Sequence, residues 1–335
     1  MSMKPSTSTM TMGRALMCRG ARSWRSGPIC GTVSRAFAIH SLTPHARTTG
    51  AKLLFHHQPR LYSTSSSKST EPSVSHTLHD HSPNAQTATI TISNPSKLNI
   101  LNSTLLDQLT QTCTTLSTNP SLRAVVLTGG PTKNSNTIPS FIGGADIKEM
   151  HALTSPSSAR AFILKVHAAC QALRALPVPV IAKIDEFCLG AGLEIAVSCD
   201  LRIATERSSF AMPEVRVGIP SVVEAALLPG LIGMGRTRRL LYLAESIGAV
   251  EAERWGLVER VVGGEGELEA GVEEWVEGIC GMGPKAIRSQ KKLMLGWENS
   301  SVEEGIQAGV EAFTEAYEDG EEPREFMRKF VNRKR

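Results

Sequence analysis

The sequence predicts an α/β fold built on a parallel sheet. Three apolar runs that are too short for helices indicate buried strands at 124–128, 178–184 and 201–204. Longer segments with helical spacing of apolar residues precede the first two runs, at 101–116 and 159–176. Strands that alternate with helices favour parallel pairing, because a helix returns the chain to the edge at which the previous strand began.

The beginning and the end of this domain also follow from the pattern. Alternation of small or polar with apolar residues predicts the first strand at 88–93. From residue 267 onward the sequence is almost wholly helical and charged. We therefore divide the domain into an α/β core of residues 87–265 and a C-terminal helical region of residues 266–335.

Length and charge exclude several classes of protein. The chain has 335 residues, of which 41% are hydrophobic, and its longest apolar runs fall far short of the roughly 20 residues that span a bilayer. The net charge is +4, but residues 1–70 hold ten Lys or Arg and no Asp or Glu, so the rest of the chain carries 26 basic and 32 acidic side chains. A mildly acidic domain is a poor binder of nucleic acid, which needs a concentrated surplus of cations.

The basic N-terminus predicts a mitochondrial transit peptide at residues 1–62. It is rich in Arg, Ser and Thr, lacks acidic residues, and includes the segment Arg14–Arg25, in which apolar residues lie between arginines. We expect cleavage near Tyr62; the alternative is a disordered basic tail or a mis-assigned start. Residues 63–86 are rich in Ser, Thr, His and Pro without periodicity, so we expect a disordered linker.

Histidine and cysteine offer little to catalysis. His76, His79 and His81 cluster in the expected linker, where a metal site is conceivable but a solvated polar segment is favoured. The domain beyond it contains His151 and His167 alone. The seven cysteines form no CxxC pair and fall mostly in apolar segments, which is typical of reduced, buried thiols.

Two glycine-bearing turns, at 140–150 and 187–195, each follow a predicted strand and precede a helical pattern. Glycine lets the backbone approach a ligand closely, and a helix start leaves amide N–H groups pointing outward. Two such donors that converge on one carbonyl oxygen form an oxyanion hole. Neither turn carries a phosphate-loop, dinucleotide or serine-hydrolase signature.

Two glutamates in the same region are candidate acid–base groups. Glu194 lies near the start of an otherwise apolar helix, two residues after Gly192, and Glu214 follows a proline. A carboxyl group on an apolar helix face should have a raised pKa, and two such groups could hold and deprotonate a water. The alternatives are that Glu194 favours the helix dipole and that Glu214 is a surface carboxylate.

Five motifs resemble the enoyl-CoA hydratase/isomerase (crotonase) family, and the resemblance extends over residues 87–335. The resemblance implies a crotonase-like spiral of ββα turns and a C-terminal helical region used for trimerisation. It also implies activity on an acyl-CoA thioester without a metal or other cofactor, in a homotrimer or hexamer. The motifs are Gly-Gly-Ala-Asp-Ile-Lys-Glu-Met (143–150), Leu-Gly-Ala-Gly-Leu-Glu (189–194), Ser-Cys-Asp-Leu-Arg-Ile-Ala (198–204), Phe-Ala-Met-Pro-Glu (210–214) and Gly-Leu-Val-Glu-Arg-Val (256–261).

The resemblance also assigns roles to residues of this chain. The backbone N–H groups of Ala145 and Ala191 would form the oxyanion hole, and Glu194 and Glu214 would be the catalytic acid–base pair. Hydratases have both glutamates, whereas related isomerases often work with the second alone, so the sequence favours hydration. The expected substrate- or CoA-binding residues are Lys97, Leu98, Ile100, Gly143, Asp146, Ile147, Gly190, Pro213, Phe330 and Arg333.

One segment departs from the family. After Gly218, most hydratases have a glycine-rich loop, whereas this chain has Ile219-Pro-Ser-Val-Val-Glu-Ala-Ala226. Straight-chain crotonyl specificity is therefore in doubt, a branched or specialised acyl group becomes plausible, and Glu224 is a secondary catalytic candidate. The alternatives to a hydratase are an enoyl-CoA isomerase, an AU-rich RNA-binding relative of methylglutaconyl-CoA hydratase, and a catalytically idle relative.

Overall fold

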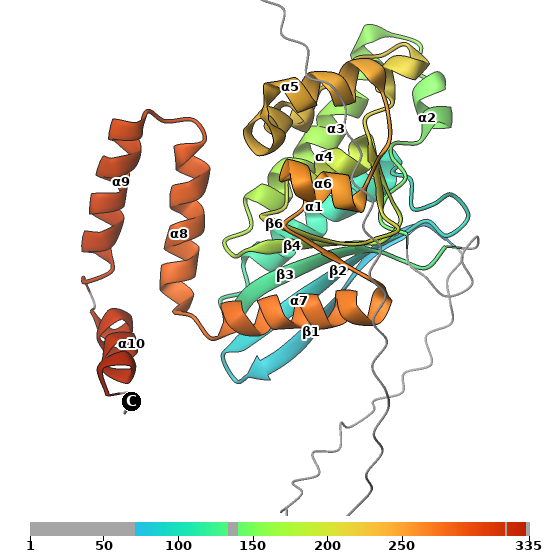
Figure 1. The fold of residues 1–335 in the computed structure, drawn as a ribbon. Helices are drawn as coiled ribbons and strands as arrows, with labels where there is room; N and C mark the ends of the chain where they lie inside the picture. Colours follow the sequence, from blue (N-terminus) through green and yellow to red (C-terminus); the bar gives the residue numbers. More distant parts are fainter. Residues whose placement is uncertain (1–70, 133–139, 319, 333–335) are drawn as a thin grey trace, which may run out of the picture. The chain divides into compact units, whose positions relative to one another are not determined.

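The central element of the protein is a six-stranded, mostly parallel sheet (Figure 1). The structure is a computed structural model that describes residues 71–132, 140–318 and 320–332. β1 pairs antiparallel with β2, and every later pair in the sheet is parallel. The strands, in their order across the sheet, are β1 (Ser73–Ser82), β2 (Ala85–Ser93), β3 (Leu122–Gly129), β4 (Val180–Ile184), β6 (Leu201–Thr205) and β9 (Arg260–Val262).

Helices cover both faces of this sheet. Val125 and Leu127 of β3 belong to the larger apolar core, whereas Val126 between them belongs to a second cluster on the opposite face. The larger core packs against α1 (Ser103–Ser117), α3 (Pro156–Arg174) and α4 (Ala191–Val197). The second cluster packs against α7 (Glu265–Cys280). The predicted α/β class is confirmed, as are each strand and helix that the periodicity predicts before residue 205.

The N-terminal boundary of the sheet corrects one prediction. Residues 63–86 are expected to form a disordered linker, but β1 occupies Ser73–Ser82 and β2 already begins at Ala85. β1 is an edge strand whose side chains are mostly exposed, and its backbone is held by a ladder of partners along β2. Because backbone pairing rather than apolar burial stabilises this strand, its polar sequence lacks the expected alternation.

The C-terminal end of the α/β core also differs from the prediction. We expect the helical region to begin at residue 266, but Leu268, Val272 and Val276 of α7 pack on the sheet, so α7 completes the core. The region beyond it consists of α8 (Pro284–Trp297), α9 (Val302–Glu315) and α10 (Glu321–Val331). In the part of the chain that the structure describes, no helix is both long and apolar enough to cross a bilayer.

A smaller sheet positions the candidate site. It contains β5 (Phe187–Leu189), β7 (Ser209–Ala211) and β8 (Ile247–Gly248), and β5 pairs parallel with β7. β5 leads into α4 and β7 leads into the short helix η1 (Glu214–Val217), so the parallel pairing brings the starts of these two helices together. The remaining elements are α2 (Ile147–His151), η2 (Val223–Leu227), α5 (Leu228–Leu243) and α6 (Ala249–Trp255).

Candidate active site

The two glycine turns of the sequence lie side by side. Ile142 of the first turn forms a parallel bridge with Cys188 of the second. The Ile142 N–H donates to the Phe187 carbonyl at 2.9 Å, and the Leu189 N–H donates to the Ile142 carbonyl at 3.1 Å. The predicted convergence of the two turns is therefore a backbone pairing between segments more than 40 residues apart in the sequence.

Each turn presents a backbone N–H group. The carbonyl of Gly144 and the N–H of Asp146 both bond to Leu101, so the N–H of Ala145 between them points to the other side of the strand. Among the described residues it has no acceptor. Ala191 is the first residue of α4, where no preceding turn of the helix supplies a carbonyl. Both N–H groups are thus available to a ligand.

Glycine is required at Gly192 for this arrangement. A Cβ at Gly192 would lie 2.3 Å from the carbonyl oxygen of Ile142, which is far below contact distance. The two turns can therefore pair because position 192 has no side chain.

Glu194 is buried in the first turn of α4, with an exposed fraction of 4%. Burial, followed by the nearby charges of Glu214 and Glu224, raises the pKa of Glu194 to about 8, although backbone N–H groups of Val222 and Ala225 oppose the shift. Glu194 consequently holds a proton at neutral pH. This agrees with the expectation from its apolar surroundings.

Glu214 is half-buried at the start of η1. Its Oε2 accepts a hydrogen bond of 2.8 Å from the hydroxyl of Ser221. Its Oε1 lies over Gly190, so close that a Cβ there would be 2.6 Å away. The turn at Gly190 and the carboxylate of Glu214 therefore fit against each other.

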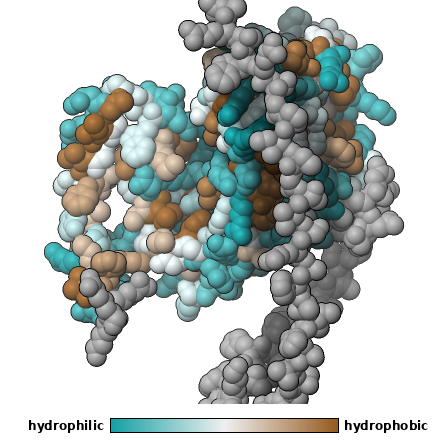
Figure 2. Space-filling view, in the orientation of Figure 1, coloured by the Kyte–Doolittle hydropathy of each residue, from teal (hydrophilic) through white to brown (hydrophobic). Residues whose placement is uncertain are grey.

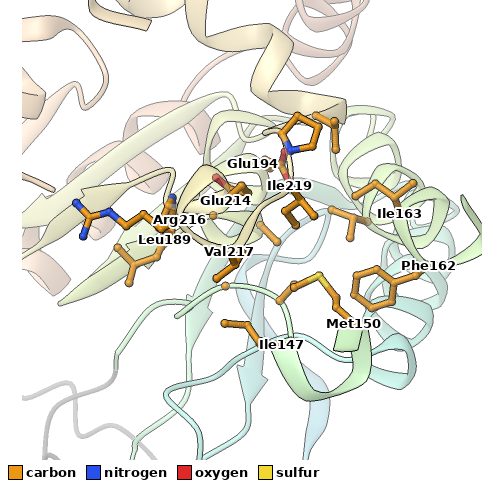
Figure 3. A pocket seen from close by; sticks show the side chains of 18 of the residues that line it. Ile147, Met150, Phe162, Ile163, Leu189, Glu194, Glu214, Arg216, Val217 and Ile219 are labelled. Carbon is orange, nitrogen blue, oxygen red and sulfur yellow. The ribbon is translucent and has the colours of Figure 1, made fainter. Parts of the chain in front are cut away.

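These groups surround one cavity of about 290 Å³. Figure 3 shows Glu194 and Glu214 together on one side of it and Met150 and Phe162 on the other. The cavity brings together eight of the predicted residues: Gly143, Ala145, Ile147, Gly190, Ala191, Glu194, Pro213 and Glu214. Both candidate donors and both candidate acid–base groups thus belong to one site.

Four of the predicted CoA-binding residues lie beside the cavity rather than on its wall. Leu98 adopts a left-handed conformation (φ 53°), and its carbonyl accepts the N–H of Gly143 at 2.9 Å. Lys97 is partly exposed and donates to Asp146 Oδ2 at 2.8 Å. Burial alone would raise the pKa of Asp146, but Lys97 and backbone N–H groups outweigh it, so the pKa is lowered. Ile100 completes this corner through its N–H bond to the Lys97 carbonyl.

Within one chain, the predicted CoA-binding residue Phe330 does not reach this cavity. Phe330 is 75% exposed on α10 and is not part of the cavity wall. Arg333 lies outside the described residues.

Sequence reasoning missed two features. Phe162, Ile163 and Val166 of α3 line the cavity, but their helical spacing indicates only a core face. Asn99 is fully buried and left-handed (φ 56°), and its Nδ2 donates to the carbonyls of Gly130 at 2.8 Å and Ser140 at 2.6 Å. Asparagine tolerates a left-handed conformation better than most residues, so its residue type was the signal in the sequence that could have indicated this turn.

Two histidines of β1 contact the paired strand of their own hairpin. His79 Nε2 lies 3.3 Å from Thr89 Oγ1, and His81 Nε2 lies 2.9 Å from Thr87 Oγ1. The described residues contain no cluster of three or more side chains suited to a metal ion.

An α/β scaffold whose cavity combines two backbone N–H donors with two carboxyl groups is typical of acid–base enzymes that stabilise an oxyanion. The family model of the enoyl-CoA hydratase/isomerases matches residues 82–335. The chain belongs to this family.

Similar proteins and similar solved structures support the same family. The chain is 37% identical over 206 residues to a short-chain-enoyl-CoA hydratase of Clostridium acetobutylicum, covering 61% of this chain and 76% of the relative. It is 37% identical over 205 residues to a crotonyl-CoA hydratase of Syntrophomonas wolfei, covering 61% and 76%. The crystal structure of an enoyl-CoA hydratase from Bacillus anthracis superposes with a TM-score of 0.70 at 29% identity, covering 78% of this chain and 96% of that one.

Proposed function

We propose that this protein is an enoyl-CoA hydratase that adds water across the double bond of a 2-enoyl-CoA thioester. The observation that carries the proposal is that Glu194, Glu214, Ala145 and Ala191 line one cavity, in which the two glutamates lie close together (Figure 3). Hydratases of this family use both glutamates, and this chain has both.

The chemistry follows from the protonation of the pair. The thioester carbonyl binds between the two N–H groups, which stabilise the enolate that forms when water attacks C3. Burial and its neighbours raise the pKa of Glu194 to about 8, so this carboxyl group can carry a proton at neutral pH. The ionised carboxylate accepts a proton from the water, and the protonated carboxyl gives its proton to C2. The reaction is redox-neutral and consumes only water, so we propose that it uses no cofactor.

The acyl group is proposed to be apolar and compact. Beyond the carboxyl groups, the cavity wall consists of Met150, Phe162, Ile163 and Val166 together with residues of the loop that departs from the family. In that loop, Ile219, Pro220 and Val222 contribute to the wall. Bulky side chains in place of glycines reduce the space for a long acyl chain, which favours a short or branched one.

We further propose that the protein acts as a homotrimer or hexamer whose CoA sites include α10 of a neighbouring copy. Support comes from the helical region, where Figure 2 shows hydrophobic surface over α8 and α9. On α9, the exposed residues Val302, Ile306, Val310 and Phe313 follow helical spacing and form one face. Phe330 and Arg333 of the neighbour would then reach CoA.

The site of action is proposed to be the mitochondrial matrix. The support is the basic, acid-free composition of residues 1–62, which lie outside the described part of the chain. Fusion of these residues to a fluorescent reporter should direct it into mitochondria, with cleavage near Tyr62. A reporter that stays in the cytosol with an intact N-terminus would contradict this.

One assay separates the proposal from its alternative, a double-bond isomerase of the same family. The purified domain is incubated with straight and branched 2-enoyl-CoA and 3-enoyl-CoA esters, and loss or gain of the conjugated enoyl absorbance is followed. A hydratase consumes 2-enoyl-CoA and yields the 3-hydroxyacyl ester. Conversion of 3-enoyl-CoA to 2-enoyl-CoA without hydration would favour the isomerase.

A further inference from the structure

A third carboxyl group, Glu224, lies buried behind the acid–base pair. Glu224 belongs to η2 and has an exposed fraction of 4%, but it is not part of the cavity wall. It occupies the loop in which most hydratases of the family have glycines. A buried carboxylate is costly unless it is paired, so its presence here requires a physical explanation.

Helix α3 clamps one oxygen of Glu224. Oε1 accepts hydrogen bonds from His167 Nδ1 at 2.8 Å and from Gln171 Nε2 at 2.9 Å. These donors are four residues apart and therefore lie on the same face of α3. The other oxygen, Oε2, is buried and has no donor among the described residues. Two side chains of α3 thus hold Glu224 through one oxygen, while its other oxygen is unpaired.

The segment that carries Glu224 also holds Glu194. The segment packs against α4, the helix that carries Glu194, and the backbone N–H groups of Val222 and Ala225 on either side of Glu224 are near enough to lower the pKa of Glu194. Fixing Glu224 on α3 therefore fixes the segment that packs against the helix of Glu194. The same segment supplies Val222 to the cavity wall.

We propose that Glu224 is a positioning residue that fixes the η2 turn beneath Glu194 and places a negative charge beside it. The proposal rests on the proposed hydratase function, because it concerns the state in which Glu194 enters the reaction. A neighbouring negative charge opposes ionisation of Glu194. The protonated form of Glu194 should therefore persist to higher pH than burial and Glu214 alone would allow.

Other groups face these two carboxyls from each neighbouring element. Glu214 of η1 faces Glu194, and it raises the pKa of Glu194 more than Glu224 does. On α3, the thiol of Cys170 interacts with both Glu194 and Glu224, and burial followed by the charge of Glu224 raises its pKa, so it stays neutral. Ser198, just after α4, interacts with that thiol and is uncharged. Glu214 and Glu224 are therefore the two side chains whose charge raises the pKa of Glu194, and the partly exposed His167 contacts Glu224.

The decisive variant is Glu224→Gln, which keeps the shape and one accepting oxygen but removes the charge. We expect the fall in kcat at alkaline pH to move about 0.5–1 pH unit lower, with little change in KM. Asp107→Asn is the matched control, because Asp107 also pairs with α3, through Lys165, but is exposed. An unshifted profile in Glu224→Gln would overturn the charge role.

A second variant separates position from charge. His167→Ala removes one clamp and leaves the charge of Glu224, and it should fold because the His167 side chain is 45% exposed. We expect kcat to fall several-fold at all pH values without movement of the alkaline fall to lower pH. Unchanged kcat, or the same shift as in Glu224→Gln, would contradict the clamp.

A readout without substrate keeps this inference separate from the hydratase proposal. The infrared band of the protonated Glu194 carboxyl is identified by its loss in Glu194→Gln, and its disappearance is followed with rising pH. The band should persist to higher pH in the natural protein than in Glu224→Gln; equal behaviour would overturn the inference. A natural protein without hydratase activity would refute the proposed function, whereas the band comparison would still decide the role of Glu224.

Discussion

Gly190 and Glu214 form a close fit between two turns of the site: a Cβ at Gly190 would lie 2.6 Å from Glu214 Oε1. Gly190 also has φ +51°, a conformation that side chains other than glycine rarely adopt. Its N–H donates to the carbonyl of Ala211 at 2.9 Å, two residues before Pro213. The carboxylate of Glu214 is therefore positioned by the absence of a side chain 24 residues earlier.

Gly190→Ala should displace Glu214 and reduce hydration. We expect a loss of about 10²-fold in kcat, because a misplaced acid–base group loses most of its effect. Gly218→Ala is the matched control: Gly218 also has positive φ (+81°), but no atom lies within 4 Å of its Cβ position. Both variants are assayed by steady-state kinetics after their thermal midpoints are measured. Equal losses in the two variants would mean that backbone strain, not displacement of Glu214, causes the effect.

Glu194→Gln and Glu214→Gln should each lower hydration by roughly 10²–10⁴-fold, the usual effect of losing a positioned acid or base. Substrate binding should survive, because the oxyanion donors are backbone groups. Turnover and dissociation constants for 2-enoyl-CoA test both statements. An isomerase would instead tolerate Glu194→Gln and fail with Glu214→Gln. Near-normal hydration by both variants would refute the assigned pair.

The buried Glu194 should also make stability depend on pH. Its pKa is raised from 4.5 to about 8 in the folded protein, so between these values the folded state binds a proton that the unfolded state has lost. Stability therefore decreases as pH rises through this window, and the loss is complete above about pH 8. Glu194→Gln should be more stable than the natural protein at pH 9, by on the order of a few kcal/mol, with little difference at pH 5. Thermal midpoints at equal protein concentration measure this; equal midpoints at pH 9 would contradict it.

Removal of residues 321–335 should weaken CoA binding by a neighbouring subunit. We expect KM for enoyl-CoA to rise while the acid–base groups, which lie elsewhere, are unchanged. Phe330→Ala is a milder variant that leaves the fold intact, because this side chain is 75% exposed. Sedimentation measures association in parallel. A truncated monomer with unchanged KM would refute the proposed contribution of α10.

The sequence by itself determined the α/β class, the strands whose side chains are buried and eight of the residues that line the candidate site. Strands such as Leu122–Gly129 are buried on both faces, so their composition reveals them. The glycine turns and the glutamate of an apolar helix can be recognised in the sequence, because few other residue types tolerate those positions. Polar β1 lacked such a signal, since its stability comes from backbone pairing with β2.

Only the tertiary structure decided which groups act on one another. The parallel pairing of β5 with β7 brings Glu214 over Gly190, and the bridge from Ile142 to Cys188 brings the two donors to one cavity. The contact of Glu224 with His167 joins residues 57 apart in the sequence. Local patterns report burial and backbone conformation, whereas a pKa such as that of Glu194 depends on charges that only the folded chain brings near.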